Sequence, residues 1–293
     1  MPCADDSRHN HENFVGTASP VECWLLVTYP QPWGASAFLE STIPSAVKNH
    51  MQSIYQQTEC SRIQVITQDS HEQLACYLAI SQENRQQLFR FDLQSYEDIL
   101  AISWEAVISK PEDYQHHLVN ESLTLICTNT AHDPCCGQYG NALFEATKSR
   151  PQVWQTNHLG GDRFAANVVV LPQGIYYRRV SKDNLIAIQV ATENQTYYLP
   201  NLGGRSYYDR HTQIAEQYLY TNQLTANTSP RWHLWQLVAS ESQGEGQSVI
   251  TFADAQKKLY HVQVTKRTTD QKALLNCHAT QPESLSTFDC KLQ

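Results

Sequence analysis

LTLICTNTAHDPCCGQYGNALFEATKSRPQVWQTNHLGGDRFAANVVVLPQGIYYRRV, residues 123–180, alternates apolar runs with polar loops around one helical pattern. With the residues that follow it, this stretch predicts the following elements in order: strand 123–127, helix 138–148, strand 152–156, a short helical turn at 163–166, strands 167–171 and 175–180, and helix 207–220. Groups able to bind metal therefore stand just beyond the carboxyl ends of two strands, where open α/β sheets usually keep their chemistry.

The preceding part of the chain shows nearly the same order. Its patterns predict strand 23–28, helix 45–57, strand 63–67, strands 74–80 and 88–93 paired as a hairpin across 82–84, and helix 95–108. A β-α-β-β-β-α order is typical of the thioredoxin fold, a mixed sheet with flanking helices. We interpret the two halves as a degenerate duplication, in which the first half has lost the cysteines of the second.

Three segments are predicted from composition and pattern. The fold class is α/β, with two thioredoxin-like halves and a small C-terminal β extension. The segments are an N-terminal α/β segment over 1–115, a thioredoxin-like segment with the candidate ligand loops over 116–225 and a β-rich extension over 226–293. Residues 1–20 are expected to form a loose polar arm, 111–117 a linker, and 240–247 a flexible polar segment.

Composition excludes several classes of protein. The 293 residues carry a formal net charge of −8 and no basic run, which argues against a nucleic-acid groove. No apolar run is long enough to insert into a membrane, and the first residues lack a secretory pattern. Nine cysteines at scattered positions do not suggest a disulfide scaffold. We therefore expect a cytoplasmic protein.

Four side chains stand out as a possible metal site. Cys127 and Cys136 flank an eight-residue loop, and His158 and Asp162 are four positions apart on the next loop. On a thioredoxin scaffold the loops after these two strands are neighbours, so the four groups can converge. Thiolates and imidazole suit iron–sulfur clusters and zinc. The pair Gly160-Gly161 permits a close backbone approach.

The same residues carry a resemblance. Cys-x8-Cys over 127–136, followed by His-Leu-Gly-Gly-Asp-Arg-Phe-Ala-Ala-Asn over 158–167, resembles the sucrase/ferredoxin-like family. Gly-Thr-Ala at 16–18, Pro-Trp-Gly at 32–34 and Gly-Arg-Ser-Tyr at 204–207 fit the same family. Its members include thioredoxin-like [2Fe–2S] proteins of fungi and bacteria, and we expect this chain to be of the bacterial, cyanobacterial type.

The resemblance implies a single [2Fe–2S] cluster and a role as an electron carrier or redox sensor with a redox partner protein. In the family pattern two cysteines and two histidines ligate, which assigns Cys127 and Cys136 to one iron and His158 to the other. Asp162 stands where the family has its second histidine. A carboxylate is harder than imidazole and adds negative charge, so it should lower the reduction potential.

Several alternatives stay open. Asp162 could face Arg163 while Cys135 or water completes the shell, and Arg163 could donate to cluster sulfurs. The donors could hold zinc instead, or the chain could be a cluster-free structural or interaction protein. Cys135 and Cys136 at a helix N-terminus could also form a thiol-active pair, with Cys127 as the resolving partner.

Enzymatic turnover is not expected. Glycosidase activity would need two catalytic carboxylates around a sugar site, and no aromatic sugar platform stands beside Asp133 and Asp162. Asp133 is instead expected to cap the helix that follows it. Ser206 is expected to cap helix 207–220, and Arg205 could reach the site.

Overall fold

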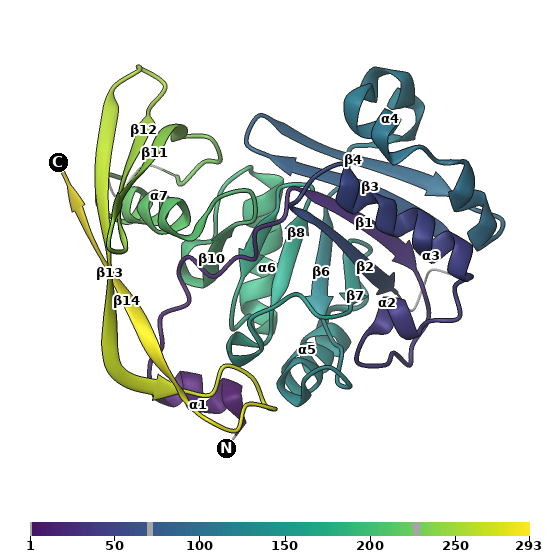
Figure 1. The fold of residues 1–293 in the computed structure, drawn as a ribbon, viewed down its shortest axis with the longest axis horizontal. Coiled ribbons are helices and arrows are strands. Elements are labelled where there is room, and N and C mark those ends of the chain that lie inside the picture. Colours follow the sequence, from purple (N-terminus) through teal and green to yellow (C-terminus); the bar gives the residue numbers. More distant parts are fainter. Residues whose placement is uncertain (1, 69–72, 225–228) are drawn as a thin grey trace.

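The computed structural model describes residues 2–68, 73–224 and 229–293. One ten-stranded mixed sheet runs through the molecule, and a separate four-stranded antiparallel sheet lies beside it (Figure 1). The strand order of the large sheet is β10-β9-β8-β6-β7-β2-β1-β3-β4-β5. The predicted α/β class, with a C-terminal β extension, is confirmed.

The first half of the large sheet is built around β1 (Cys23–Thr28), which is buried along nearly its whole length. It pairs in parallel with β2 (Ser61–Thr67) and antiparallel with β3 (Ala75–Gln82). β3 pairs with β4 (Arg85–Asp92), which pairs with the short β5 (Leu118–Val119). The predicted hairpin between β3 and β4 is confirmed.

The second half repeats this arrangement around β6 (Leu123–Cys127). β6 pairs in parallel with β7 (Val153–Thr156) and antiparallel with β8 (Val168–Leu171). β8 pairs with β9 (Ile175–Tyr177), which pairs with β10 (Leu202–Arg205). The strand that follows the central one in sequence is therefore its parallel neighbour in both halves, as the predicted duplication requires.

The halves join through equivalent strands. β2 and β7 pair antiparallel, but only at their last residues, Ile66 with Thr156 and Thr67 with Gln155. The carboxyl ends of the central strands consequently point toward a common region, where the loops that follow β1 and β6 meet. Asn129 Nδ2 donates to the Gly34 carbonyl across this junction at 3.1 Å.

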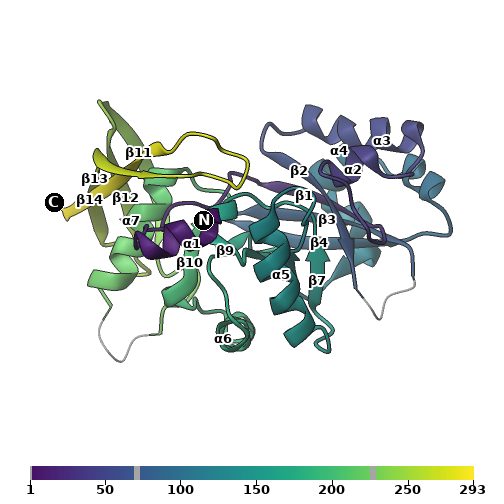
Figure 2. The ribbon, with the colours of Figure 1, turned by 90° about the horizontal axis from the view of Figure 1, so that it is seen from below.

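Strand alternation sends side chains into separate cores. Leu25 and Val27 of β1 face α3 (Ser45–Gln52), whereas Ile126 of β6 faces α5 (Pro134–Thr147) and further helices of its half. The opposite faces of both halves share one core, which contains Cys127. In Figure 2, α2 (Ala37–Glu40) and α3 lie over the first half, and α5 over the second.

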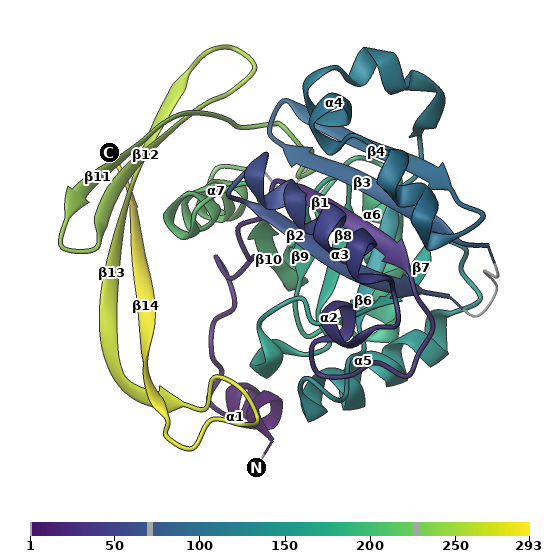
Figure 3. The ribbon, with the colours of Figure 1, turned by 45° about the vertical axis from the view of Figure 1, so that its right-hand side comes forward.

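The C-terminal sheet consists of β11 (Gln236–Gly244), β12 (Gln247–Ala253), β13 (Leu259–Ala273) and β14 (Glu283–Leu292) in sequential order. It packs on α7 (Arg210–Asn222), while the far ends of β13 and β14 arch toward the N-terminal helix (Figure 3). The prediction of a flexible segment over 240–247 is wrong. Most of this segment belongs to the exposed edge strand β11, whose backbone pairs with β12. Because an exposed edge strand needs little apolar pattern, its sequence resembles that of a loop.

The prediction of a loose N-terminal arm is also wrong. Residues Cys3–His9 form the helix α1, in which Cys3 and Ala4 are fully buried. The predicted helix 95–108 is split into η2 (Tyr96–Ala101) and α4 (Trp104–Ser109), because Ser103 caps a new start. The predicted helix 45–57 likewise ends as η1 (Ser53–Gln56). The expected linker is a 3₁₀ segment, η3 (Pro111–His117).

Two elements of the second half were not predicted, α6 (Lys182–Glu193) and β10. The helix expected at 207–220 begins instead at Arg210, because the Asp209 side chain accepts a hydrogen bond from Thr212 N. Ser206 is not its cap and donates to the Val21 carbonyl at 2.6 Å. Two further 3₁₀ turns, η4 (Asp162–Phe164) and η5 (Leu199–Asn201), complete the described elements. Within the described ranges, no helix combines the length and apolar character needed to cross a bilayer.

Candidate metal centre

Two buried cysteines face each other where β6 ends and α5 begins. Cys127 is the last residue of β6, and Cys136 lies in the first turn of α5. Asp133 caps that helix as predicted, accepting a hydrogen bond from Cys135 N at 2.8 Å. A Cβ on Gly140 would lie 1.9 Å from the Cys127 carbonyl oxygen. Only glycine therefore lets α5 pack this closely on the end of β6.

The loop after β7 brings the second pair of side chains. Gly160 and Gly161 both have a positive φ, +88° and +81°, which turns the chain so that Asp162 begins η4 facing inward. Asp162 Oδ1 lies 3.1 Å from Cys136 Sγ and 3.0 Å from His158 Nδ1. The donor atoms of Cys127, Cys136 and His158 all lie within 4.8 Å of one another. The structure thus brings together all four residues selected from the sequence.

A buried arginine that the sequence did not single out holds this loop in place. The guanidinium of Arg178 donates to the Gly160 carbonyl at 2.7 Å and to Asn167 Oδ1 at 2.9 Å. It also donates to the Thr17 carbonyl in the segment before β1. Burial lowers the pKa of Arg178 to about 10, which leaves it positively charged at neutral pH. Arg178 therefore places a positive charge close to Cys127 and Cys136.

The four donors are arranged as a network of opposite charges. The hydrogen bond from Cys136 outweighs burial and, with His158 alongside, lowers the pKa of Cys127 to about 5. Burial works against the imidazolium, but Asp162 and Cys127 beside it raise the pKa of His158 to about 9. Burial also works against the Asp162 carboxylate, yet His158 lowers its pKa. A bound cation could replace the protons on His158 and Cys136 as the positive partner of this set.

The donors fit a metal group by their chemistry as well as by position. His158 Nδ1 is buried and makes no aligned hydrogen bond, although it lies at ion-pair distance from Asp162. A buried imidazole nitrogen held only by an unaligned contact with a carboxylate is well suited to ligate a metal. The His132 ring stacks on that of His158 with centroids 3.8 Å apart, and both histidines group with Asp162. His132 therefore offers a second imidazole beside His158 and Asp162.

Comparison with known proteins identifies the family of this chain. The profile of the family described as "Sucrase/ferredoxin-like" matches residues 14–202. This chain belongs to the sucrase/ferredoxin-like family. It is 22% identical over 169 residues to "Altered inheritance of mitochondria protein 32" of Debaryomyces hansenii, covering 54% of this chain and 60% of that protein. The chain thus spans about three fifths of the relative's length. No solved structure matches the chain. The bacterial type stays a prediction.

The other residues expected near the site of this family member have different neighbours. Arg163 Nε pairs with Glu12 at 2.8 Å. Arg205 is buried, where it forms an ion pair with Glu216 and donates hydrogen bonds to two tyrosines of the second half. Cys135 Sγ lies 3.3 Å from Cys277 Sγ. In the described part of the chain Cys135 shares no donor group with Asp162, and the ion-pair partner of Arg163 is Glu12.

Two alternatives for this region were a thiol-active pair at Cys135 and Cys136 and a sugar site at Asp133. Burial raises the pKa of Cys135 to about 11, and the Cys127 hydrogen bond with burial raises that of Cys136. Both shifts are opposite to those of a reactive thiol at a helix start. The carboxylate of Asp133 is fully buried and accepts backbone hydrogen bonds at both oxygens. It is therefore poorly placed to act on a sugar.

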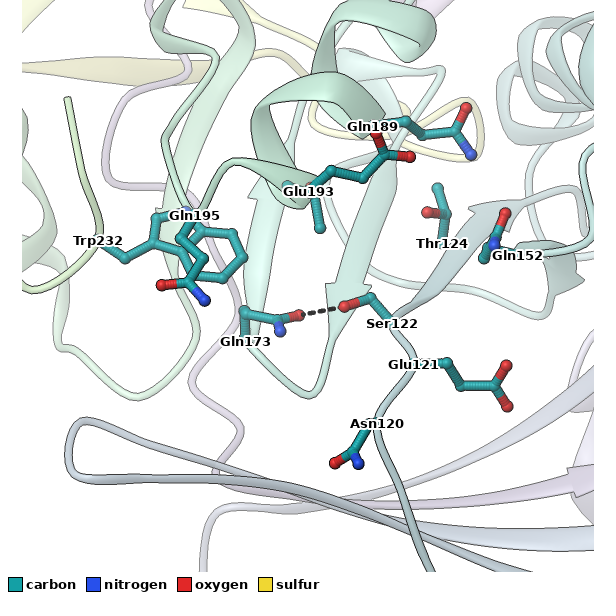
Figure 4. A pocket seen from close by; sticks show the side chains of 11 residues that line it. Asn120, Glu121, Ser122, Thr124, Gln152, Gln173, Gln189, Glu193, Gln195 and Trp232 are labelled. Carbon is teal, nitrogen blue, oxygen red and sulfur yellow. Dashed lines mark hydrogen bonds between the residues drawn. The ribbon is translucent and has the colours of Figure 1, made fainter. Parts of the chain in front are cut away.

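A hollow of about 390 Å³ lies elsewhere in this family member (Figure 4). It is lined mainly by amide, hydroxyl and carboxylate side chains around Thr124, with Trp232 at one side. Ser122 donates to Gln173 across it at 3.3 Å. Because Thr124 is near the start of β6 and Cys127 is its last residue, the hollow is at the opposite end of the strand from the metal centre.

Proposed function

We propose that this chain holds one [2Fe–2S] cluster and works as an electron carrier or redox sensor. Cys127 and Cys136 would hold one iron, with His158 and Asp162 at the other. The observation that carries the proposal is the convergence of four buried or half-buried metal donors, which come from the end of β6, the first turn of α5 and the segment after β7. Family membership supports it.

When bound, such a cluster supplies a one-electron redox couple. The protein's own residues decide how that couple behaves. Buried Cys127 and Cys136 exclude water from the sulfur side of the site. Asp162 adds a negative charge that lowers the reduction potential, while Arg178 adds a positive charge that raises it. The His158 side chain is 22% exposed and gives the site its accessible edge.

That edge sets the place where a partner would dock. His158 and the His132 ring stacked on it form the exposed side of the site, so electrons would pass to a redox protein there. All nine cysteines are free thiols, which suits a reducing compartment such as the cytoplasm. We do not assign substrate turnover to the chain, since its donors suit electron transfer.

The test is the iron and acid-labile sulfide content of the full chain purified without oxygen. We expect about two irons and about two sulfides per chain, with visible absorption. Asp162→Ala should lose or loosen the cluster if the carboxylate ligates. Retention in Asp162→Ala but loss in His132→Ala would assign the second nitrogen to His132. His116→Ala, in η3, is the control histidine and should retain the full iron content.

Other outcomes contradict the proposal. Colourless protein that contains neither iron nor sulfide under these conditions would favour a cluster-free structural or interaction protein. Zinc in place of iron at Cys127 and Cys136 would convert the site into a mononuclear one. Either result would leave the fold and family unchanged.

A further inference from the structure

A second group of cysteines lies on the other side of the first turn of α5. Cys3 begins α1, Cys135 lies next to the N-cap of α5, and Cys277 is in the connection between β13 and β14. Cys277 Sγ lies 3.3 Å from the sulfurs of both Cys3 and Cys135. With Asp133, each residue contributes one donor atom, and these atoms all lie within 4.8 Å of one another.

The Asp133 carboxylate organises this group. One oxygen accepts a hydrogen bond from Cys135 N at 2.8 Å, and the other accepts one from Cys277 N, also at 2.8 Å. A single buried side chain thus fixes the backbone of two of the three cysteines. A carboxylate has about four lone-pair positions, so both oxygens keep a free acceptor after these bonds.

The surroundings suit a closed metal site. Cys3, Cys135 and Asp133 are fully buried, and Cys277 is half-buried. Ala4, Ala165 and Leu274 pack around the sulfurs and make the shell apolar. His278 reinforces the connection, because its Nε2 lies 2.9 Å from the His132 carbonyl oxygen and donates a hydrogen bond to it. The arrangement joins segments up to 274 positions apart in the sequence.

From these contacts we infer that Cys3, Cys135 and Cys277, with Asp133, form a structural Zn²⁺ site separate from the [2Fe–2S] centre. Three thiolates and one carboxylate give the four protein donors of a closed zinc site. Soft thiolates disfavour magnesium and calcium. Thiolates around one tetrahedral zinc lie about 3.8 Å apart, so the observed sulfur separations need to widen by only a few tenths of an ångström.

The zinc ion would join both ends of the described chain to the ferredoxin-type half. α1 and the β13–β14 connection would be held against the first turn of α5, which presents Cys136 to the other site. The zinc site needs none of the four cluster donors, so it stands or falls independently of the proposed function.

The experiment uses the full chain carrying Cys127→Ser and His158→Ala, which removes two donors of the other centre. Titration with Co²⁺ alone, under a phosphine reductant and without oxygen, should give a single bound ion with thiolate-to-cobalt charge-transfer absorption. Zn²⁺ should displace it. Adding Cys277→Ser should lower that absorption by about a third and weaken zinc binding roughly 100-fold or more. Cys290→Ser, a cysteine of β14 outside the group, is the matched control and should bind as the parent does.

Asp133→Asn provides a second variant that keeps the size of the side chain, and it should weaken zinc binding roughly 10- to 100-fold. Far-ultraviolet circular dichroism verifies that each variant is folded. Failure to bind Co²⁺ and Zn²⁺, or binding that is unaffected by Cys277→Ser, would overturn the zinc site. So would a disulfide among the three cysteines in protein purified under reductant. Metal analysis separates the two proposals. Zinc that is retained with Cys127→Ser and His158→Ala but lost with Cys277→Ser supports this site, whereas iron without zinc in the unsubstituted chain contradicts it and supports the cluster.

Discussion

The two halves of the large sheet share one strand order, yet among the described residues only the second half brings possible metal ligands together at the end of its central strand. The central strand β1 ends at Thr28, whose hydroxyl donates to the Ala75 carbonyl at 3.2 Å and accepts from Ala75 N at 2.9 Å. The central strand β6 ends at Cys127, whose sulfur faces Cys136 and His158. The same position in the topology therefore extends the pairing of β1 with β3 in one half and carries a candidate metal ligand in the other.

The first half contacts the candidate site through the loop after β1. Its loop after β1 packs against the loop after β6, where the Gly34 carbonyl accepts from Asn129 and the Ala35 carbonyl lies 3.3 Å from His132 Nδ1. Gln31 Nε2 donates to Gln155 of β7 at 2.7 Å. The loop after β1, which contributes no candidate metal ligand, therefore still holds the loop after β6 in place through hydrogen bonds.

The largest expected difference between the halves is in cofactor retention. Cys136→Ser should abolish iron and sulfide binding, because an alcohol is a poor replacement for a thiolate. Cys60→Ser, in the turn before β2 of the first half, should keep both at the level of the unsubstituted chain. Iron analysis and visible spectra of anaerobically purified protein measure the effect. Equal retention in both variants would show that the halves do not differ in this way.

A smaller effect is expected on the reduction potential when Asp162 of the second half is replaced. Asp162→His supplies the imidazole of the family pattern and removes a negative charge, so the reduction potential should rise. We expect a shift on the order of 100 mV, equivalent to about 2.3 kcal/mol for one electron. Protein-film voltammetry measures it, with Asp183→Asn on the exposed face of α6 as a charge control. An unchanged potential would mean that Asp162 does not contact the cluster.

The smallest expected effect tests the support given by the first half. Asn129→Ala leaves the Gly34 carbonyl without its amide partner and removes one of the two acceptors of the His132 N–H, whose other acceptor is the Asn129 backbone carbonyl. Chemical denaturation should show a loss of about 1–2 kcal/mol in the free energy of unfolding. Asn141→Ala removes an amide that donates to Thr130 on the exposed side of the same loop, and it should cost less than about 0.5 kcal/mol. Equal costs for the two variants would argue against support across the junction.

Local patterns were enough for the elements that place the candidate site. The apolar runs of β1 and β6, the hairpin of β3 and β4 and the cap at Asp133 are encoded by neighbouring residues, and each was predicted. α6 also carries a local signal, since Ser181 and Asn184 form a capping box, and that signal went unused. These features depend on backbone preferences over a few positions.

Other features depend on which distant segments pack together. α1 looks like a polar arm until its Cys3 and Ala4 are buried by α5 and the C-terminal connection. Arg178 looks like a surface residue after β9 until the Gly160 carbonyl and Thr17 surround its guanidinium.

The sequence by itself determined the α/β class, the two half-sheets, the family and the four donors proposed for the cluster. Tertiary structure alone decided that the halves join through β2 and β7, that His132 stacks on His158, and that Cys3, Cys135 and Cys277 meet. The physical reason is range. Helix and strand patterns repeat within a few residues, whereas a contact between residues 274 positions apart depends on how the whole chain buries its surface.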